Sequence, residues 1–277
     1  MNRMGWVQLA AGAVLIAGTL SAFAQPPAPG SGIIGIANIA LRVSDVDKEV
    51  AFLGKLGFEE AFTSKLGPNA LEVFVKVNDR QFIEVYSRTD PSQPLSWMHV
   101  CYEAGDLNAL QKFYASTGLD PTPARKGSAG NLLSSLKDPS GTITEFTQYM
   151  PGSRHTLDRG QHLDPNRISN AIVGFVMPVS ELAVMKDFYT RLGFEAEDAG
   201  SVVHLTTPGA PDLHIEISPA TAGSRPQILM PVPDAHKAAD QLRRLGVVAV
   251  RQEKKEIVSV RDDDGNSFVL LETGSKE

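Results

Sequence analysis

One pattern recurs four times along the chain and limits what the chain can fold into. Each copy begins with a short apolar run, continues with an amphipathic helical segment and ends with two or three strand-like runs. The predicted helices cover residues 46–56, 106–117, 181–192 and 234–245, and each is followed by a glycine: Gly57, Gly118, Gly193 and Gly246. A glycine directly after the last helical residue is typical of a left-handed helix cap. The chain is therefore predicted to contain four βαβββ units.

A single βαβββ unit cannot cover both faces of its small sheet, but two units side by side can close into one cupped sheet with helices outside. Four units predict an α+β fold of two cupped mixed β-sheet domains. We expect these domains over residues 33–150 and 168–273. Residues 151–167, which lie in a stretch rich in Pro, Gly, Arg and His without periodicity, are predicted to be the linker between them.

The first 24 residues have the features of an export signal. Arg3 is followed by an uncharged run over residues 6–24 that ends in Ala22, Phe23 and Ala24, a small-x-small cleavage pattern. We expect cleavage after Ala24, a flexible linker over residues 25–32, and export to a bacterial periplasm with no stable membrane anchor after cleavage. An uncleaved transmembrane anchor is the alternative, because 19 uncharged residues can span a bilayer.

Composition excludes several classes of protein. Among the 277 residues, 42% are hydrophobic and 21% are charged, which is a globular balance rather than that of a disordered chain. The net charge of -6 without a basic block argues against nucleic acid as a partner. Cys101 is the one cysteine, so an intrachain disulfide, a zinc ribbon and an iron–sulfur cluster are all excluded.

Several short segments carry a resemblance to a known family. They are residues 39–45 before the first predicted helix, 55–58 at its end, 138–146 in the second unit, and 191–194 and 264–266 in the second half. Their arrangement resembles the vicinal oxygen chelate (VOC) superfamily, which includes glyoxalases, bleomycin-resistance proteins and ring-cleaving dioxygenases. The resemblance implies a small-molecule substrate or ligand and one divalent metal ion in a cup. It is specific for fold and much less so for function, because one fold hosts many chemistries.

Mapped onto this chain, the family's metal-binding positions in the first cup are Asn38, Glu84, His99 and Glu145. In each unit 46 residues separate the two positions, Asn38 from Glu84 and His99 from Glu145, as a pseudo-symmetric site requires. Two carboxylates and an imidazole suit one divalent ion such as Zn, Ni, Mn or Fe, and three strong ligands leave positions open for substrate. The resemblance also implies catalytic roles for Glu84 and Glu145, one of which would act as general base. Asn38 is a departure, since the family usually has His there; its amide is a weak ligand or bonds a metal-bound water.

A structural interpretation stands beside this one. His99 could be a core histidine, and Glu84 and Glu145 could be solvated on outer faces. However, both carboxylates lie within strands that look half buried, where an unpaired charge is costly. Every second residue of a strand points to the same face, which adds a set of candidate substrate-binding residues: Arg42, Phe82, Tyr86, Cys101 and Glu103. Arg42 either anchors an anionic group or pairs with Glu103, and Cys101 is expected to be a buried apolar residue rather than a nucleophile.

The second cup is expected to be degenerate. Its matching positions are Gly174 (or Ile172), Glu216, Gln227 and Val269, which do not form a ligand set. His214 and Glu216 share a strand face, with His204 on a nearby strand, and commonly such residues form a polar surface pair. No role is assigned to His155, His162 or His236.

These observations favour an exported metalloenzyme, a glyoxalase-like lyase or isomerase with its site in the first cup. A ring-cleaving dioxygenase fits less well, because the resemblance places the working site of four-unit dioxygenases in the second half, where this chain lacks the ligands. The alternatives are a metal-free, bleomycin-resistance-like binding protein and a structural protein that acts through partners. A homodimer is compatible with each of these functions.

Overall fold

The computed structural model describes residues 32–68, 70–252 and 257–273. The predicted export signal at residues 1–24 and nearly all of the predicted linker at 25–32 lie outside the described residues. The first half contains β1 (Ile33–Val43), α1 (Val46–Lys55), β2 (Glu59–Gly67), β3 (Ala70–Lys76), β4 (Phe82–Ser87), β5 (Ser96–Ala104), α2 (Leu107–Ser116), β6 (Arg125–Lys126), β7 (Leu132–Lys137) and β8 (Ile143–Gln148). A short helix, α3 (Arg154–Leu157), precedes the second half, which contains β9 (Gly174–Val179), α4 (Leu182–Arg191), β10 (Glu195–Ala199), β11 (Val202–Thr207), β12 (Ala210–Pro219), β13 (Gln227–Val232), α5 (Ala235–Arg244), β14 (Ala249–Gln252), β15 (Ile257–Arg261) and β16 (Ser267–Glu272).

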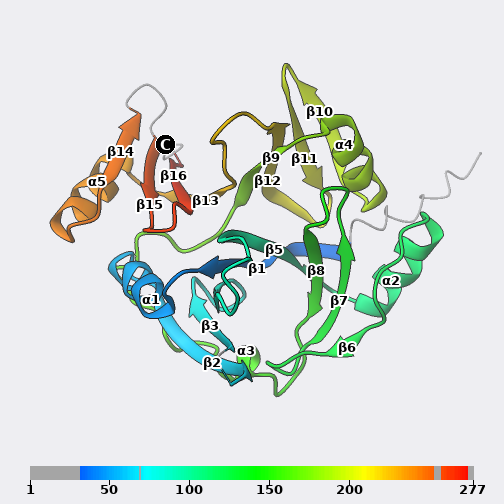
Figure 1. Cartoon of the computed structure of the whole chain (residues 1–277), viewed down its shortest axis with the longest axis horizontal. Helices are drawn as coiled ribbons and strands as arrows, with labels where there is room; N and C mark the ends of the chain where they lie inside the picture. The colour runs from blue at the N-terminus through cyan, green and yellow to red at the C-terminus, as the bar shows by residue number, and fades with distance from the viewer. Residues whose placement is uncertain (1–31, 69, 253–256, 274–277) are drawn as a thin grey trace, which may run out of the picture.

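The strands form two eight-stranded mixed sheets with the same order (Figure 1). The first runs β2-β3-β4-β1-β5-β8-β7-β6 and the second runs β10-β11-β12-β9-β13-β16-β15-β14. In each sheet the first strands of two units pair antiparallel at the centre, and each pairs on its other side with the last strand of its own unit in parallel. The predicted α+β fold of four βαβββ units paired into two cupped sheets is confirmed.

The helices begin and end where the sequence predicts, within a residue. Asp45, Asp106 and Asp234 cap three of them by accepting a hydrogen bond from the backbone N–H three residues on. Such a cap satisfies an N–H group that has no partner within the helix. The predicted cap glycines have positive φ angles, from 70° at Gly246 to 91° at Gly193. The signals that set these boundaries are therefore local to each helix.

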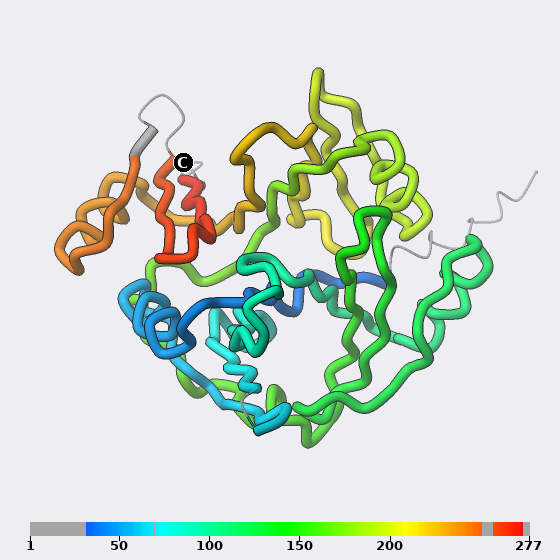
Figure 2. The backbone as a smooth tube through the Cα atoms, viewed as in Figure 1, coloured from blue at the N-terminus to red at the C-terminus, as the bar shows by residue number. Residues whose placement is uncertain are grey.

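The two sheets pack against each other through a shared apolar core (Figures 1 and 2). Trp97 of the first half contacts Phe175 of the second with ring centroids 5.3 Å apart, and Tyr102 contacts Phe194 at 5.5 Å. Gln81 joins the halves through its amide, which donates to the backbone oxygen of Ile172 and accepts from its N–H, both at 2.8 Å. None of the described helices is both long and apolar enough to cross a membrane.

The segment between the halves is anchored to the first sheet. The Nζ of Lys76, which is fully buried, donates to the carboxylate of Asp158 at 2.8 Å and to its backbone oxygen at 2.6 Å. Arg154 donates to the backbone oxygen of Thr63 at 2.9 Å, and its guanidinium carbon lies 4.3 Å from the ring centroid of Phe62. The predicted linker thus contains a helical turn that is packed on the domain before it.

Candidate functional site in the first cup

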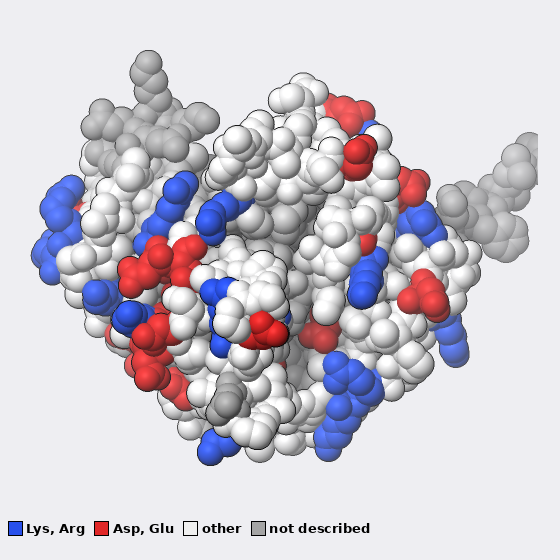
Figure 3. All heavy atoms as spheres, in the orientation of Figure 1, with Lys and Arg blue, Asp and Glu red and all other residues white. Residues whose placement is uncertain are grey.

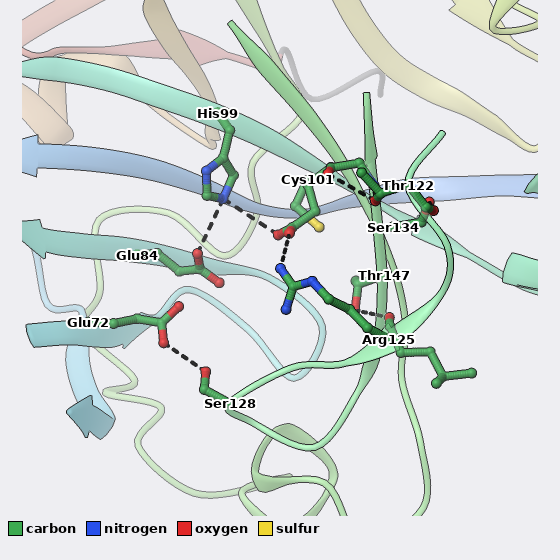
Figure 4. A network of polar contacts seen from close by, with 12 residues as sticks. Glu72, Glu84, His99, Cys101, Thr122, Arg125, Ser128, Ser134 and Thr147 are labelled. Carbon is green, nitrogen blue, oxygen red and sulfur yellow. Dashed lines mark hydrogen bonds and ion pairs between the residues drawn. The ribbon is translucent and has the colours of Figure 1, made fainter. Parts of the chain in front are cut away.

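Three side chains from three strands meet inside the first sheet (Figure 4). The Nε2 atom of His99 on β5 lies 3.5 Å from an Oε atom of Glu84 on β4 and 3.7 Å from an Oε atom of Glu145 on β8. These are the three residues that the sequence predicts as metal ligands. The structure brings them together, although β4 and β5 are separated in the sheet by β1.

Burial and mutual charge shift the protonation of this group. His99 is 6% exposed and Glu84 is 4% exposed. Burial raises the pKa of Glu84 and of Glu145, against the opposing effect of His99. Burial alone would lower the pKa of His99, but the neighbouring carboxylates Glu84 and Glu145 outweigh it and the net shift is upward. A divalent cation would oppose all three upward shifts, because metal ligands bind in their deprotonated forms.

Two members of this group, Glu84 and Glu145, lie in the wall of a cavity of about 200 Å³. Asn38, Glu84, Tyr86 and Glu145 line it together with further polar residues, among them Glu72 of β3 and Thr147 of β8, and with several apolar residues. The further lining residues are Leu66, Glu72, Phe74, Arg125, Gly127, Ser128, Ala129, Asn131, Leu133, Thr147, Tyr149 and His155. In the space-filling view the face shown is hollowed near its middle (Figure 3). A concave site with convergent polar groups is where a small ligand is expected to bind.

Glu72 adds a third carboxylate that the sequence does not single out. It accepts hydrogen bonds from the hydroxyl of Tyr86 and, at 2.8 Å, from the hydroxyl of Ser128. The Tyr86 hydroxyl also lies 3.2 Å from Glu84, so it links the two carboxylates. Tyr86 and His99 therefore both contact Oε2 of Glu84, and Tyr86 joins this carboxylate to Glu72.

The residues of this site fit a divalent ion. In the described part of the chain the buried Oδ1 of Asn38 and Nε2 of His99 make no hydrogen bond of ordinary geometry. Two ligand atoms with bonds of about 2.1 Å to one ion lie at most roughly 4.2 Å apart, and both distances from His99 Nε2 are shorter than that limit. No group of three or more His, Cys, Asp and Glu side chains among the described residues is yet arranged to hold an ion. A full set of ligands would therefore require the carboxylates to turn away from their present partners.

Four of the residues predicted to bind substrate are placed outside the cavity lining. Arg42 donates to the backbone oxygen of Pro94 at 3.2 Å, and Glu103 pairs with Arg80, so the expected Arg42–Glu103 pair is not formed. Phe82 is fully buried against other aromatic rings. Cys101 is a buried free thiol whose pKa is raised by burial, which agrees with an apolar role rather than a nucleophilic one.

The structure adds cavity residues that period two along the predicted strands could not reveal. Arg125 lies at the edge strand β6, 4.0 Å from Glu145. Asn131 and His155 come from a loop and from α3 in the connector. A histidine in a stretch without periodicity carries no positional signal, and the sequence therefore assigns no role to His155. The structure places it in the cavity wall.

In the second cup, the structure shows a steric limit at the position that matches Asn38. Gly174 occupies the position that matches Asn38, and a Cβ atom there would lie 1.7 Å from the backbone oxygen of His214. No side chain can therefore project from this position. His204 and Glu216 lie 3.5 Å apart, but their side chains are 51% and 35% exposed, as in a polar surface pair.

Comparison with known proteins supports the fold described above. Residues 171–270 match the family model of the Glyoxalase/Bleomycin resistance protein/Dioxygenase superfamily. The second half is a domain of this superfamily. The first half repeats the same strand order, so the whole chain has the VOC fold. No curated protein matches the chain.

Solved structures share this VOC fold across both domains. The 2,3-dioxygenase LapB from Pseudomonas sp. KL28 has a TM-score of 0.67 at 14% identity, over 88% of this chain and 93% of that one. A catechol 2,3-dioxygenase has a TM-score of 0.61 at 14% identity, over 86% and 87%. The Mn(II)-bound glyoxalase from Novosphingobium aromaticivorans has a TM-score of 0.62 at 16% identity, over 88% and 83%. At these identities the similarity establishes the fold alone.

Proposed function

We propose that this VOC protein is a metal-dependent enzyme of glyoxalase type, a lyase or isomerase, with its active site in the first cup. The observation that carries the proposal is the meeting of the buried His99 with Glu84 and Glu145, two carboxylates that line a cavity. Buried carboxylates around an imidazole are costly as a purely structural feature, because removing charges from water is only repaid by close partners.

In this proposal Glu84, His99 and Glu145 hold one divalent ion, and Asn38 is a weak fourth ligand. A bound Zn, Ni, Mn or Fe ion would polarise two oxygens of a small oxygenated substrate as a Lewis acid. Glu84 and Glu145 are placed to take or return a proton at the substrate, since each has one oxygen directed at His99 and lines the cavity. Tyr86 orients Glu84, and Arg125 at the rim attracts anionic substrates.

Metal content tests the proposal directly. The protein is dialysed against buffer with trace Zn, Ni, Mn and Fe, and bound metal is measured by mass spectrometry for wild type, His99→Ala and His204→Ala. We expect about one ion per chain in wild type and in His204→Ala, whose histidine belongs to the second cup, and almost none in His99→Ala. Equal metal content in all three proteins would contradict the proposal.

A metal-free ligand-binding protein is the second candidate. It is favoured by the ion pairs that His99 already makes and by the weak ligand Asn38. In that case wild type would be free of metal and would still bind small oxygenated compounds in the cavity.

A ring-cleaving dioxygenase is a third candidate and is less favoured, because the second cup lacks ligands. Export through residues 1–24, homodimerisation and the absence of a nucleic-acid partner remain predictions from the sequence.

A further inference from the structure

The connector between the halves delivers one histidine to the cavity of the first cup. His155 of α3 is 4% exposed and lines the cavity. Its ring is packed edge-on against Phe62, Phe74 and Phe82, with centroids 5.1, 5.1 and 4.6 Å away and interplanar angles of 88–89°. Tyr149 lies on its other side at 5.1 Å. The imidazole is therefore held in one orientation by aromatic neighbours.

Asn131 determines which ring nitrogen carries the proton. Its Oδ1 accepts the backbone N–H of Met150 at 3.1 Å, so the amide orientation is fixed and Nδ2 faces His155. Nδ2 is a donor and lies 2.9 Å from Nδ1 of His155, which must then be the acceptor. A neutral imidazole that accepts at Nδ1 carries its proton at Nε2.

The Nε2 donor is left without a partner. Within the described residues this buried atom makes no hydrogen bond. Burial lowers the pKa of His155 to about 4, so the ring stays neutral at ordinary pH. A buried N–H without an acceptor costs free energy of folding, and such groups are rare unless a ligand completes them.

We propose that His155 donates its Nε2–H to a carbonyl or carboxylate oxygen of the substrate and that Asn131 is the positioning residue for this donor. The proposal rests on the proposed function, because it uses the same cavity. It assigns the substrate two contact regions, one at Glu84, His99 and Glu145 and one at His155. Glu84, Glu145 and His155 line the same cavity, so one small molecule can reach both regions. The substrate class is a small molecule that bears an oxygen acceptor apart from its chelating oxygens.

Nitrogen-15 spectra of the imidazole test the donor without relying on activity. We expect Nε2 protonated and Nδ1 bare in His155 between pH 5 and 8. The probes are catechol, which has two neighbouring oxygens, and 3,4-dihydroxybenzoate, which adds a carboxylate at the far end of the ring. The Nε2 signal should move on addition of 3,4-dihydroxybenzoate and stay in place with catechol, in Zn-loaded or Zn-free protein. A proton on Nδ1, or an Nε2 signal that moves with neither probe in either form, overturns the proposal.

Binding affinities of the full chain separate this proposal from the proposed function. In Zn-loaded wild type we expect 3,4-dihydroxybenzoate to bind roughly tenfold more tightly than catechol, the value of one hydrogen bond to a charged group. His155→Phe keeps an aromatic ring but should lose this advantage, whereas His155→Gln can place an N–H near the position of Nε2 and should keep most of it. An unchanged ratio in His155→Phe means that Nε2–H faces the phenylalanine rings and is structural. If both probes bind equally tightly with and without zinc, the proposed metal enzyme is contradicted. The ratio of the two binding affinities then still tests the role of His155.

Discussion

His99 and Glu84 face each other across a single small residue, Ala40. Ala40 of β1 is the register partner of Glu84 on one side, in parallel pairing, and of His99 on the other, in antiparallel pairing. Directly paired residues project to the same face of a sheet, so all three side chains point into the cup. The methyl group of Ala40 leaves room above it, and the imidazole and the carboxylate approach to 3.5 Å over that space.

Divalent metal should stabilise the folded protein through this site. A ligand at 100 times its dissociation constant adds about 2.7 kcal/mol to the free energy of unfolding. We expect Zn²⁺ to raise the Tm of wild type and of Glu216→Gln, a control in the second cup, and to leave the Tm of Glu145→Gln nearly unchanged. Scanning calorimetry with and without Zn²⁺ measures this. A similar rise in all three proteins would locate the ion elsewhere.

Glu49 should make stability fall with rising pH. This residue of α1 is buried beside Asp262, Asp263 and Asp264 of the second half, and burial followed by the charge of Asp262 raises its pKa from 4.5 to about 9. Acidic side chains gather on this side of the molecule, where α1 meets the β15–β16 turn (Figure 3). Between these pH values the folded state keeps a proton that the unfolded state has lost, so the free energy of unfolding decreases as pH rises, by up to about 1.4 kcal/mol per pH unit.

Glu49→Gln tests this effect, because the amide resembles the protonated acid in shape. Its free energy of unfolding in urea should increasingly exceed that of wild type from pH 5 to pH 9. The exposed Glu59→Gln is the control and should follow the wild-type pH profile. Parallel pH profiles of Glu49→Gln and wild type would show that Glu49 ionises normally.

Lys76 should be a major contributor to stability. Its fully buried ammonium group is paired with Asp158 at 2.8 Å and Asp79 at 2.9 Å. Lys76→Ala removes the buried ammonium from the carboxylate of Asp158, which keeps only His162 at 2.6 Å, and removing one partner of a buried pair typically costs about 3–5 kcal/mol. The control is Lys186→Ala, which removes an ion pair with the exposed Asp198 and should cost less than about 1 kcal/mol. Urea unfolding measures both variants. Equal losses of unfolding free energy would mean that the buried ion pair contributes no more than the exposed one.

A ligand cannot be restored to the second cup by one substitution. In Gly174→Asn the new Cβ would collide with the backbone of β12, so we expect a loss of stability well above the roughly 1 kcal/mol of an average point mutation and no gain of metal. Gly200→Asn is the matched control. Its φ is 70° and a Cβ there meets nothing within 4 Å, so asparagine is tolerated. Thermal unfolding compares the two, and a stable Gly174→Asn that binds metal would refute this explanation of the degenerate cup.

The four units and the helix boundaries could be predicted from the residues, because helix periodicity and glycine caps are local signals. The three residues that meet in the first cup were predicted from the resemblance to the VOC superfamily, supported by a 46-residue spacing that repeats between units. Each signal survives in the sequence because its physical cause lies within a few residues or recurs with the repeat.

The surroundings of Glu84, His99 and Glu145 became known only from the tertiary structure. Glu72, Asn131 and His155 reach the cavity from a neighbouring strand, a loop and the connector, and their positions depend on packing between segments far apart in the chain. The alternation along its strand predicts that Arg42 points into the cup, but its guanidinium donates to the backbone oxygen of Pro94. Periodicity predicts the face on which a side chain lies, whereas its partner depends on which distant segment packs beside it.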